Sequence, residues 1–376
     1  MTRTVPAVWA PVFFSIVTVA SFVMGSCATA SEPFSTVVYQ HGIDGYHTFR
    51  IPSLLRTQKG TLLAWCEGRK TSGDDHGDID LVQKHSADGG STWSKMQVIY
   101  EEGGDKQITT GNPCPVIDQS TGRIWMPFCR DNDYVLVMFS DDDGQTWSAP
   151  VDITQDVKAD DWNWYATGPG IGIQLERGRY KGRMVIPCDH SIERDGKRIM
   201  VSHVFYSDDH GESWKLGGSL EIHTDECQVV ELADGTLMLN ARNYWGRSGA
   251  RPDRGGKRAV SYSKDGGDTW SDLEFDETLI EPVCEASLLH YHPRPKHLLF
   301  SNPASTTTRH KMTVRLSRDE GRTWPVAKLL HAGPSAYSSL IVLSDGSVGC
   351  LYEAGDVGGS RDRITFARFD LNWLTE

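Results

Sequence analysis

The sequence predicts an all-β fold, a six-bladed β-propeller with four antiparallel strands per blade. An eight-residue pattern, Ser-x-Asp-x-Gly-x-(Thr/Ser)-Trp, occurs five times at intervals of 54 to 67 residues. A second pattern, an apolar run followed by a polar turn and another apolar run, occurs six times out of phase with the first. No helical periodicity of useful length follows the first thirty residues. Six such units have the size and strand content of propeller blades.

The copies of the first pattern are predicted to be hairpin turns. Each follows a short β-forming run, such as VLVMF before the second copy. Gly supplies the positive φ of the turn, the Asp side chain can bond turn backbone, and Trp offers an apolar plate between neighbouring units. The copies begin at Ser86, Ser140, Ser207, Ser263 and Ser317. We therefore expect the main role of the motif to be structural.

The second pattern supplies the other half of each blade. Its six hairpins are SLLRTQKGTLLAW, VIDQSTGRIWMPF, IQLERGRYKGRMVIP, VVELADGTLMLN, SLLHYHPRPKHLLF and LIVLSDGSVGCLY. One such hairpin and one Asp-bearing hairpin give four strands in about 55–60 residues. The last unit has no room for a second hairpin before Glu376. We therefore expect the terminal run RITFARF to pair with an N-terminal strand and close the ring.

Composition indicates one folded domain over residues 31–376. With 10% aromatic and 39% hydrophobic residues the chain can bury a sizeable core, and no low-complexity stretch divides it. The net charge of −12 argues against nucleic acid as a partner, because binding phosphates requires a basic face. Nothing in the sequence implies a metal or an organic cofactor, and nothing indicates an oligomeric state.

Residues 1–30 are predicted to be a signal peptide. Arg3 precedes an apolar stretch from about Ala7 to Met24, and Ala28-Thr29-Ala30 fits cleavage before Ser31. We expect a periplasmic or secreted protein with no transmembrane span in the mature chain. In an alternative reading, Gly25-Ser26-Cys27 is a lipoprotein-like junction and Cys27 carries a lipid anchor. The other cysteines lack metal-ligand spacing and are expected to be buried thiols: Cys66, Cys114, Cys129, Cys188, Cys227, Cys284 and Cys350.

Several polar residues are expected to meet at one rim of the ring. They fall where the first strand of a unit begins, where the second ends or where the third begins, and antiparallel strands bring these positions to the same side. The Asp-bearing turns lie at the opposite rim. The rim residues are Arg50, Asp74, Glu226, Arg242, Arg309, Tyr337 and Glu353. Coming from four units, they would converge on the central channel.

This set of residue types indicates an anionic substrate. Three guanidinium groups in one cavity repel each other unless an anion joins them, and the Arg fork suits a planar carboxylate. A sugar with a carboxylate at its anomeric carbon, as in sialic acid, meets this requirement. Tyr337 beside Glu226 would supply a nucleophile, because the carboxylate can take the phenol proton.

Each of these residues also has an ordinary structural interpretation. A single Arg is more often the surface partner of a carboxylate, and a lone Tyr more often packs at a strand edge. Asp75 and Asp78 compete with Asp74 in a loop of uncertain register. A further set could line a sugar pocket or simply pack: Trp162, Trp164, Tyr165 and His190. The DDDG of the second turn lacks the alternating ligands of a calcium loop.

The whole mature chain resembles the bacterial exo-α-sialidases, from FRIP at residues 49–52 to LYEAG ending at Gly355. The resemblance implies a sialidase-type propeller that cleaves terminal α-linked sialic acids from glycoconjugates with retention, through a Tyr nucleophile. Its carboxylate-binding triad matches Arg50, Arg242 and Arg309. Asp74 matches the acid/base, Tyr337 and Glu226 the nucleophile pair, Arg69 a site-lining arginine, and Glu353 the carboxylate that steadies the first triad arginine.

Other functions remain open on the sequence. The same scaffold could transfer sialic acid to another glycan or hydrolyse a related 2-keto sugar acid. It could also be an idle sialic-acid-binding propeller that keeps only the arginines. The presence of Asp74, Glu226 and Tyr337 argues against the last alternative, since binding alone does not require them.

Overall fold

A computed structural model describes residues 1–7, 9–10, 32–104, 106–248, 251–356 and 359–376. The chain divides into two compact units, Met1–Ala30 and Ser31–Glu376. The predicted signal peptide lies outside the described residues from position 11 onward, and so does Cys27. Everything below concerns the second unit.

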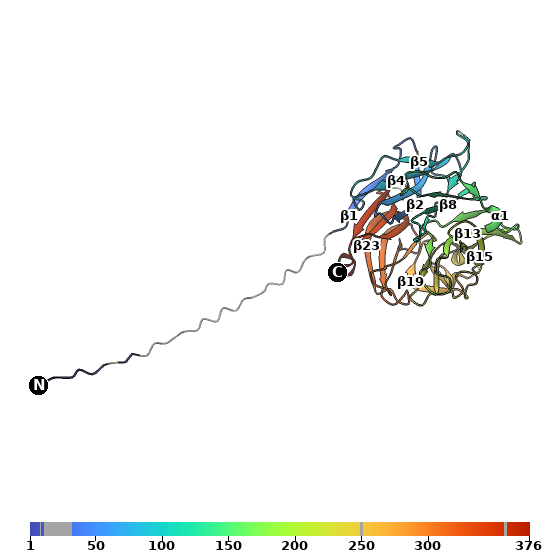
Figure 1. The fold of residues 1–376 in the computed structure, drawn as a ribbon. Helices are drawn as coiled ribbons and strands as arrows, with labels where there is room; N and C mark the ends of the chain where they lie inside the picture. The colour runs from blue at the N-terminus through green and yellow to red at the C-terminus, as the bar shows by residue number, and fades with distance from the viewer. Residues whose placement is uncertain (8, 11–31, 105, 249–250, 357–358) are drawn as a thin grey trace. The chain divides into compact units, whose positions relative to one another are not determined.

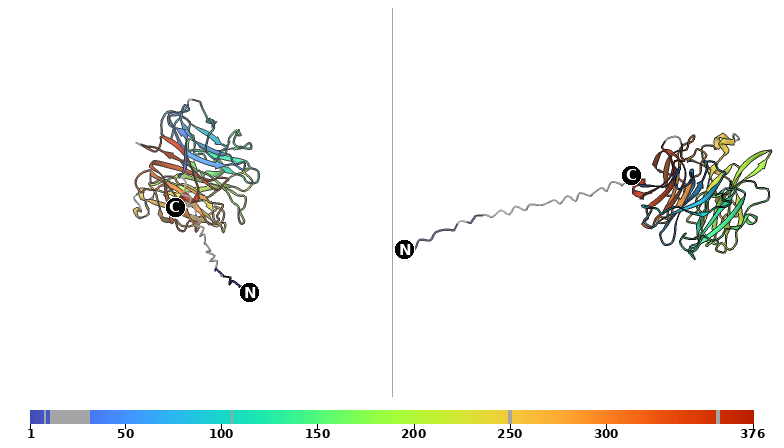
Figure 2. Two further views of the ribbon diagram at one scale, coloured as in Figure 1. Left: turned by 90° about the vertical axis from the view of Figure 1, so that its left-hand side faces the viewer. Right: turned by 90° about the horizontal axis from the view of Figure 1, so that it is seen from above.

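The second unit has an all-β, propeller-like fold of antiparallel sheets arranged side by side around a centre (Figures 1 and 2). Among the described residues, the strands group into five sheets. The first contains β2 (Thr48–Arg56), β3 (Leu62–Arg69), β4 (Ile79–Ser86) and β5 (Gln97–Tyr100). Another contains β16 (Thr224–Glu231), β17 (Leu237–Asn243), β18 (Lys257–Ser263) and β19 (Glu274–Ile280).

Two sheets lie between these in the sequence. One contains β6 (Thr110–Gly111), β7 (Val116–Ile117), β8 (Ile124–Arg130), β9 (Tyr134–Ser140) and β10 (Val151–Asp152). The next contains β11 (Tyr165–Thr167), β12 (Ile173–Gln174), β13 (Met184–Arg194), β14 (Lys197–Ser207) and β15 (Lys215–Ser219). Only short helices join the strands of the described residues: α1 (Thr154–Val157), α2 (Trp245–Ser248), the 3₁₀ turn Pro252–Arg254 and α3 (Leu371–Thr375).

The last sheet has seven strands because one long strand is shared. It contains β20 (Ser287–His290), β21 (Leu298–Pro303), β22 (His310–Ser317), β23 (Val326–Val342), β24 (Val348–Ala354), β25 (Arg363–Phe369) and β1 (Phe34–Gln40). The first half of β23, up to Pro334, pairs with β22, and the second half, from Ser335, pairs with β24.

The predicted closure of the ring is confirmed by the pairing of β1 with β25, in which Phe34 lies opposite Arg368. The six predicted hairpins of the second pattern are confirmed as well. They form the pairs β2–β3, β7–β8, β12–β13, β16–β17, β20–β21 and β23–β24.

The Asp-bearing motifs form turns with one repeated hydrogen-bond pattern. In the second copy, the Gly144 amide donates to Ser140 Oγ (2.9 Å) and the Thr146 amide donates to Asp142 Oδ1 (2.9 Å). The Thr146 hydroxyl donates to the other carboxylate oxygen (2.6 Å). The same bonds recur in the other four copies. A local side-chain network therefore fixes each turn.

The motif tryptophans pack between neighbouring sheets, as the sequence predicts, and the structure shows that the motif glycines lie at the same contacts. A Cβ atom added to Gly211, whose φ is 90°, would lie 2.2 Å from the ring of Trp125 on β8. The motif residue Trp214 packs edge-on against that ring, with ring centroids 6.0 Å apart. Glycine is required here by both backbone conformation and space.

The core lies between the sheets in several apolar clusters, one of which contains Trp125, Phe205 and Trp214. All seven cysteines of the described residues are buried and unpaired, which confirms the prediction of buried thiols. Within the described part of the chain, no helix has the length and apolar character needed to cross a membrane.

Candidate active site

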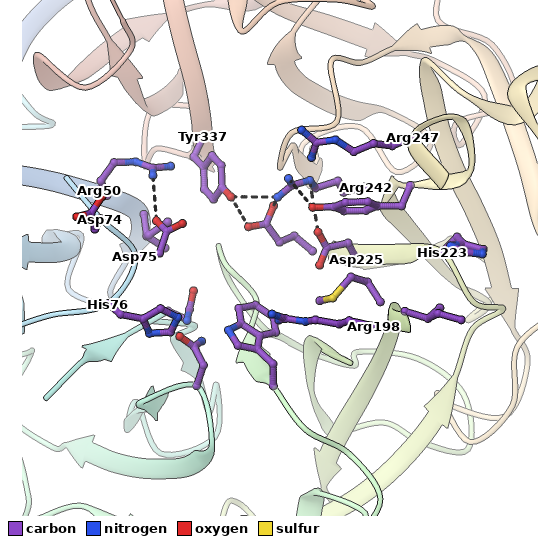
Figure 3. A pocket seen from close by; sticks show the side chains of 18 of the residues that line it. Arg50, Asp74, Asp75, His76, Arg198, His223, Asp225, Arg242, Arg247 and Tyr337 are labelled. Carbon is purple, nitrogen blue, oxygen red and sulfur yellow. Dashed lines mark hydrogen bonds and ion pairs between the residues drawn. The ribbon is translucent and has the colours of Figure 1, made fainter. Parts of the chain in front are cut away.

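A pocket of about 1200 Å³ opens at one rim of the fold (Figure 3). It is lined by most of the residues predicted for the site: Arg50, Arg69, Asp74, Glu226, Arg242, Arg309 and Tyr337. The remaining predicted residue, Glu353, is fully buried directly behind Arg50. The Asp-bearing turns contribute nothing to the lining. The topology thus gathers residues from β2, β16, β17 and β23 around one cavity.

Tyr337 and Glu226 form the centre of the pocket. The Tyr337 hydroxyl donates a short hydrogen bond to Glu226 Oε1, and Arg242 Nη1 donates to the other carboxylate oxygen at 2.6 Å. Arg242 Nη1 also lies 3.3 Å from the Tyr337 hydroxyl (Figure 3). One carboxylate therefore links the phenol to a guanidinium group.

The phenol of Tyr337 is neutral in the free protein. Burial raises the pKa of Tyr337, and the charge of Glu226 raises it further, although nearby guanidinium groups act in the opposite direction. Arg50 and Arg309 lie over the Tyr337 ring, 5.0 and 5.6 Å from its centroid. The ring is thus surrounded by cations while its hydroxyl faces a base.

Arg50 is aimed by an irregularity of β2. The register between β2 and β3 shifts after Arg50, and Ile51 has a φ of 61°, which is a strained value for a β-branched residue. This bulge lets Glu353 Oε1 accept both from Arg50 Nε (2.7 Å) and from the Ile51 amide (3.0 Å). Glu353 therefore fixes the side chain and the unusual backbone together.

Arg309 completes the set of arginines and is held more loosely. Its Nη2 donates to the carbonyl of Val283 at 3.1 Å, and no ion pair forms between it and any carboxylate of the described residues. Its guanidinium group is therefore available to an anion in the pocket.

Arg69 organises the loop after β3. Glu67 accepts from its Nε (3.0 Å) and Nη2 (2.6 Å). Its Nη1 donates to the carbonyls of Gly73 and Asp74 and to Asp75 Oδ1 (2.7 Å). Because Arg69 joins Glu67 on β3 to three residues of the loop, it holds the loop in position.

The loop places Asp75, rather than Asp74, against the arginines. Asp75 Oδ1 lies 3.5 Å from Arg50 Nη1 in addition to its bond with Arg69 (Figure 3). The Asp74 carboxylate accepts from the Ser72 hydroxyl (3.0 Å) and contacts none of the three arginines. Burial raises the pKa of Asp75, but the charges of Arg69 and Arg50 outweigh this and hold the pKa below its usual value.

The sequence did not single out two partners of Arg242. Asp225 Oδ2 lies 3.4 Å from Arg242 Nε, and the Tyr244 hydroxyl accepts from Arg242 Nη2 at 2.9 Å. Tyr244 lies two positions after Arg242, and since alternate residues of a strand face the same side, this spacing could have indicated it. Asp225 directly precedes Glu226 in the chain, and this position beside a predicted site residue was the one feature of the sequence that could have indicated it.

The aromatic residues left open by the sequence divide into two kinds. Trp164 lines the pocket. Trp162 stacks on His190 with ring centroids 3.4 Å apart, and Tyr165 is fully buried, so these three residues pack. Among the described residues, no group of three His, Cys, Asp or Glu side chains is arranged to hold a metal ion.

Comparisons with known proteins identify the family of the chain. A family model described as "BNR repeat-like domain" matches residues 60–350. The exo-alpha-sialidase of Arthroderma benhamiae is 31% identical over 88% of this chain and 85% of its own length. The chain belongs to the sialidase family. A sialidase of Micromonospora viridifaciens is 35% identical over 89% of this chain but only 53% of its own length.

Solved structures agree with this membership. The Hadza microbial sialidase Hz136 superposes with a TM-score of 0.80 and 32% identity, covering 91% of this sialidase-family chain and 69% of that chain. This chain spans 53% of the length of the M. viridifaciens sialidase and 61% of the length of a Bacteroides fragilis sialidase.

Proposed function

We propose that the protein is an exo-α-sialidase that hydrolyses terminal α-linked sialic acids of glycoproteins, glycolipids and oligosaccharides. One observation carries the proposal: the Tyr337 hydroxyl is bonded to the Glu226 carboxylate in a pocket that also contains three arginines. Binding a sialic acid requires only the arginines. A phenol paired with a base serves bond cleavage.

The arginines hold the substrate by its carboxylate. Arg50, Arg242 and Arg309 surround the Tyr337 ring, so a planar carboxylate bound between them places the anomeric carbon beside the phenol oxygen. A neutral nucleophile avoids bringing a second anion against that carboxylate.

Cleavage proceeds in two displacements. The phenol oxygen attacks the anomeric carbon and its proton passes to Glu226, while an aspartic acid protonates the departing glycosidic oxygen. Water then gives a proton to the same aspartate and displaces the phenol oxygen, which regains its proton from Glu226. Two inversions at one carbon leave the configuration retained.

The acid in this scheme comes from the loop that Arg69 organises. Asp74 is the residue favoured by spacing from Arg69, whereas Asp75 is the residue that reaches Arg50 and Arg69. The contacts support Asp75. A substrate carboxylate on Arg50 would release Asp75 from that ion pair and make it a better proton donor.

The test is release of methylumbelliferone from 4-methylumbelliferyl sialoside, together with proton NMR of the first sialic acid released from a natural sialoside. The α anomer should appear first. Tyr337→Phe should lower kcat by roughly 10³-fold or more while sialic acid still binds. An unchanged kcat in this variant would show that Tyr337 is not the nucleophile. Products carrying sialic acid on an added galactoside would indicate a transferase instead.

The proposed fold is a ring of six blades. Counting the seven-stranded sheet as two sheets that share β23 gives four strands in each of the last two blades, and the switch at Pro334 marks their boundary. An experimental structure with a ring of only five separate sheets would contradict this count.

Export through residues 1–30 belongs to the same proposal. The expected result is a mature protein that begins at Ser31, as measured by intact mass after expression with the natural leader. A mass that corresponds to a lipid-modified chain beginning at Cys27 would favour the alternative junction.

A further inference from the structure

One hairpin of the body ends in the wall of the pocket. Strands β13 and β14 have 11 residues each and are joined by Asp195-Gly196, both with positive φ (54° and 67°), which is the geometry of a tight two-residue turn. Most strands of the neighbouring sheets are shorter. Because of this extra length the tip of the hairpin lines the pocket that contains Tyr337.

The tip carries three cations without carboxylate partners. Arg194 and Lys197 lie directly opposite each other in the register, and like charges in this position cost stability. The guanidinium group of Arg198 lies over the Trp164 ring, 5.1 Å from its centroid. Within the described part of the chain, none of the three forms an ion pair, although acidic residues outnumber Lys and Arg by 50 to 38. Asp195, the carboxylate at the turn, forms none with them either.

The pocket has room beyond the three arginines of the centre. Its volume of about 1200 Å³ exceeds the usual range of about 300–1,000 Å³ for small-molecule sites. Arg198 reaches into it from the side opposite Arg50 (Figure 3). A substrate held by its carboxylate at Arg50, Arg242 and Arg309 leaves these outer cations free.

We propose that the hairpin tip formed by Arg194, Lys197 and Arg198 binds a second anionic group of the substrate. This inference rests on the proposed sialidase function and specifies its substrate class. The occupant that fits best is the carboxylate of a second sialic acid, because Arg forks match a planar carboxylate and the cavity accommodates more than one sugar. A sulfate ester on a neighbouring sugar has the same charge and would use the same cations.

The experiment compares kcat/KM for three substrates that end in the same sialic acid. They are sialyl-lactose, which has a neutral leaving group, disialyl-lactose with two linked sialic acids, and sialyl-lactose with a sulfate ester on galactose. Exposed ion pairs contribute about twofold to fivefold each. In the variant Arg194→Gln/Lys197→Gln/Arg198→Gln, the ratio of kcat/KM for disialyl-lactose to that for sialyl-lactose should fall about tenfold. The loss should be smaller in high salt, which screens exposed charges.

Two further variants control for damage to the pocket. Lys197→Gln alone leaves the contact of Arg198 with Trp164 intact and should lower the ratio by about twofold to fivefold. Lys264→Gln removes an exposed charge in an Asp-bearing turn that does not line the pocket and should leave the ratio unchanged. A fall confined to the sulfated substrate would assign the tip to sulfate. An unchanged ratio for both anionic substrates would overturn the proposal, while absence of any sialic acid release would instead refute the hydrolase itself.

Discussion

The hydrogen bond from Tyr337 to Glu226 sets the reactivity of the pocket. The pKa of the phenol is raised by burial and by the charge of Glu226, so the nucleophile is neutral in the resting protein. Arg242 donates to Glu226 and lies within hydrogen-bond distance of the Tyr337 hydroxyl, so it holds the two groups in position for the proton transfer. The phenol therefore loses its proton to Glu226 only as its oxygen begins to bond to the anomeric carbon.

Asp75 and Asp74 can be separated by a matched pair of substitutions. Asp75→Asn should lower kcat on sialyl-lactose by about 10²–10⁴-fold, the usual contribution of a general acid, because the glycosidic oxygen would leave unprotonated. Asp74→Asn, in a residue whose carboxylate contacts Ser72, should change kcat by less than about threefold. Steady-state kinetics of both variants test this. The opposite ranking would return the role to Asp74.

Binding of sialic acid should be accompanied by proton uptake. In the free protein Arg69 and Arg50 keep the pKa of Asp75 low, so the carboxylate is ionised at neutral pH. A ligand carboxylate that neutralises Arg50 raises this pKa, and a group whose pKa rises on binding takes up a proton. Affinity should therefore increase as the pH falls from neutral toward the raised pKa that Asp75 has in the complex. Calorimetry in buffers of different ionisation enthalpy measures the uptake, and Asp75→Asn should abolish it.

The hairpins are defined by local chemistry at one end and by contacts with neighbouring sheets at the other. Each Asp-bearing turn satisfies its own backbone donors through one carboxylate and one Ser hydroxyl. The Gly and Trp of the same motif then pack on the adjacent sheet, as Gly211 and Trp214 do on Trp125. One motif therefore serves both the turn and the interface between sheets.

Removing one turn carboxylate should affect stability and leave catalysis intact. Asp142→Ala deletes the acceptor for the Thr146 amide and hydroxyl and should lower the free energy of unfolding by about 1–3 kcal/mol. Asp141→Ala, which removes only an exposed ion pair with Arg123, should cost less than about 1 kcal/mol. Denaturant unfolding compares the two. Because these turns do not line the pocket, kcat/KM should stay within about twofold of the parent value in both variants.

Features with a local cause could be predicted from the sequence, and features fixed by register could not. The turns, the six hairpins and the pairing of RITFARF with the N-terminal strand all follow from short patterns. By contrast, the choice between Asp74 and Asp75 depends on which loop carbonyls Arg69 binds. The shared strand β23 depends on pairing with two partners along its length. The length of the β13–β14 hairpin likewise emerges only from its register.

The body as a whole depends on the pairing of β1 with β25. Without β1, β25 would present an unpaired edge with its backbone donors and acceptors exposed, and such edges promote aggregation. The same strand also contributes Val38 and Tyr39 to the core cluster between β1 and its neighbours. Closure thus combines hydrogen bonding and burial.

Deletion of β1 should therefore destabilise the whole fold. A chain that begins at His41 is expected to lose cooperative unfolding or to unfold at a clearly lower denaturant concentration, and to aggregate. A chain that begins at Glu32 retains β1 and serves as the control. Circular dichroism during denaturation and light scattering give the readouts. Equal stability of the two chains would show that the closing strand contributes little.

The pairing of Phe34 with Arg368 also has a use in protein engineering. Since the two ends of the folded body meet in one sheet, a short linker could join them and new termini could be opened at another surface loop. Such a circularly permuted chain would retain every strand pairing while changing their order in the gene. The gene could then be cut and rejoined at successive loops, to find which linear orders of the strands still assemble.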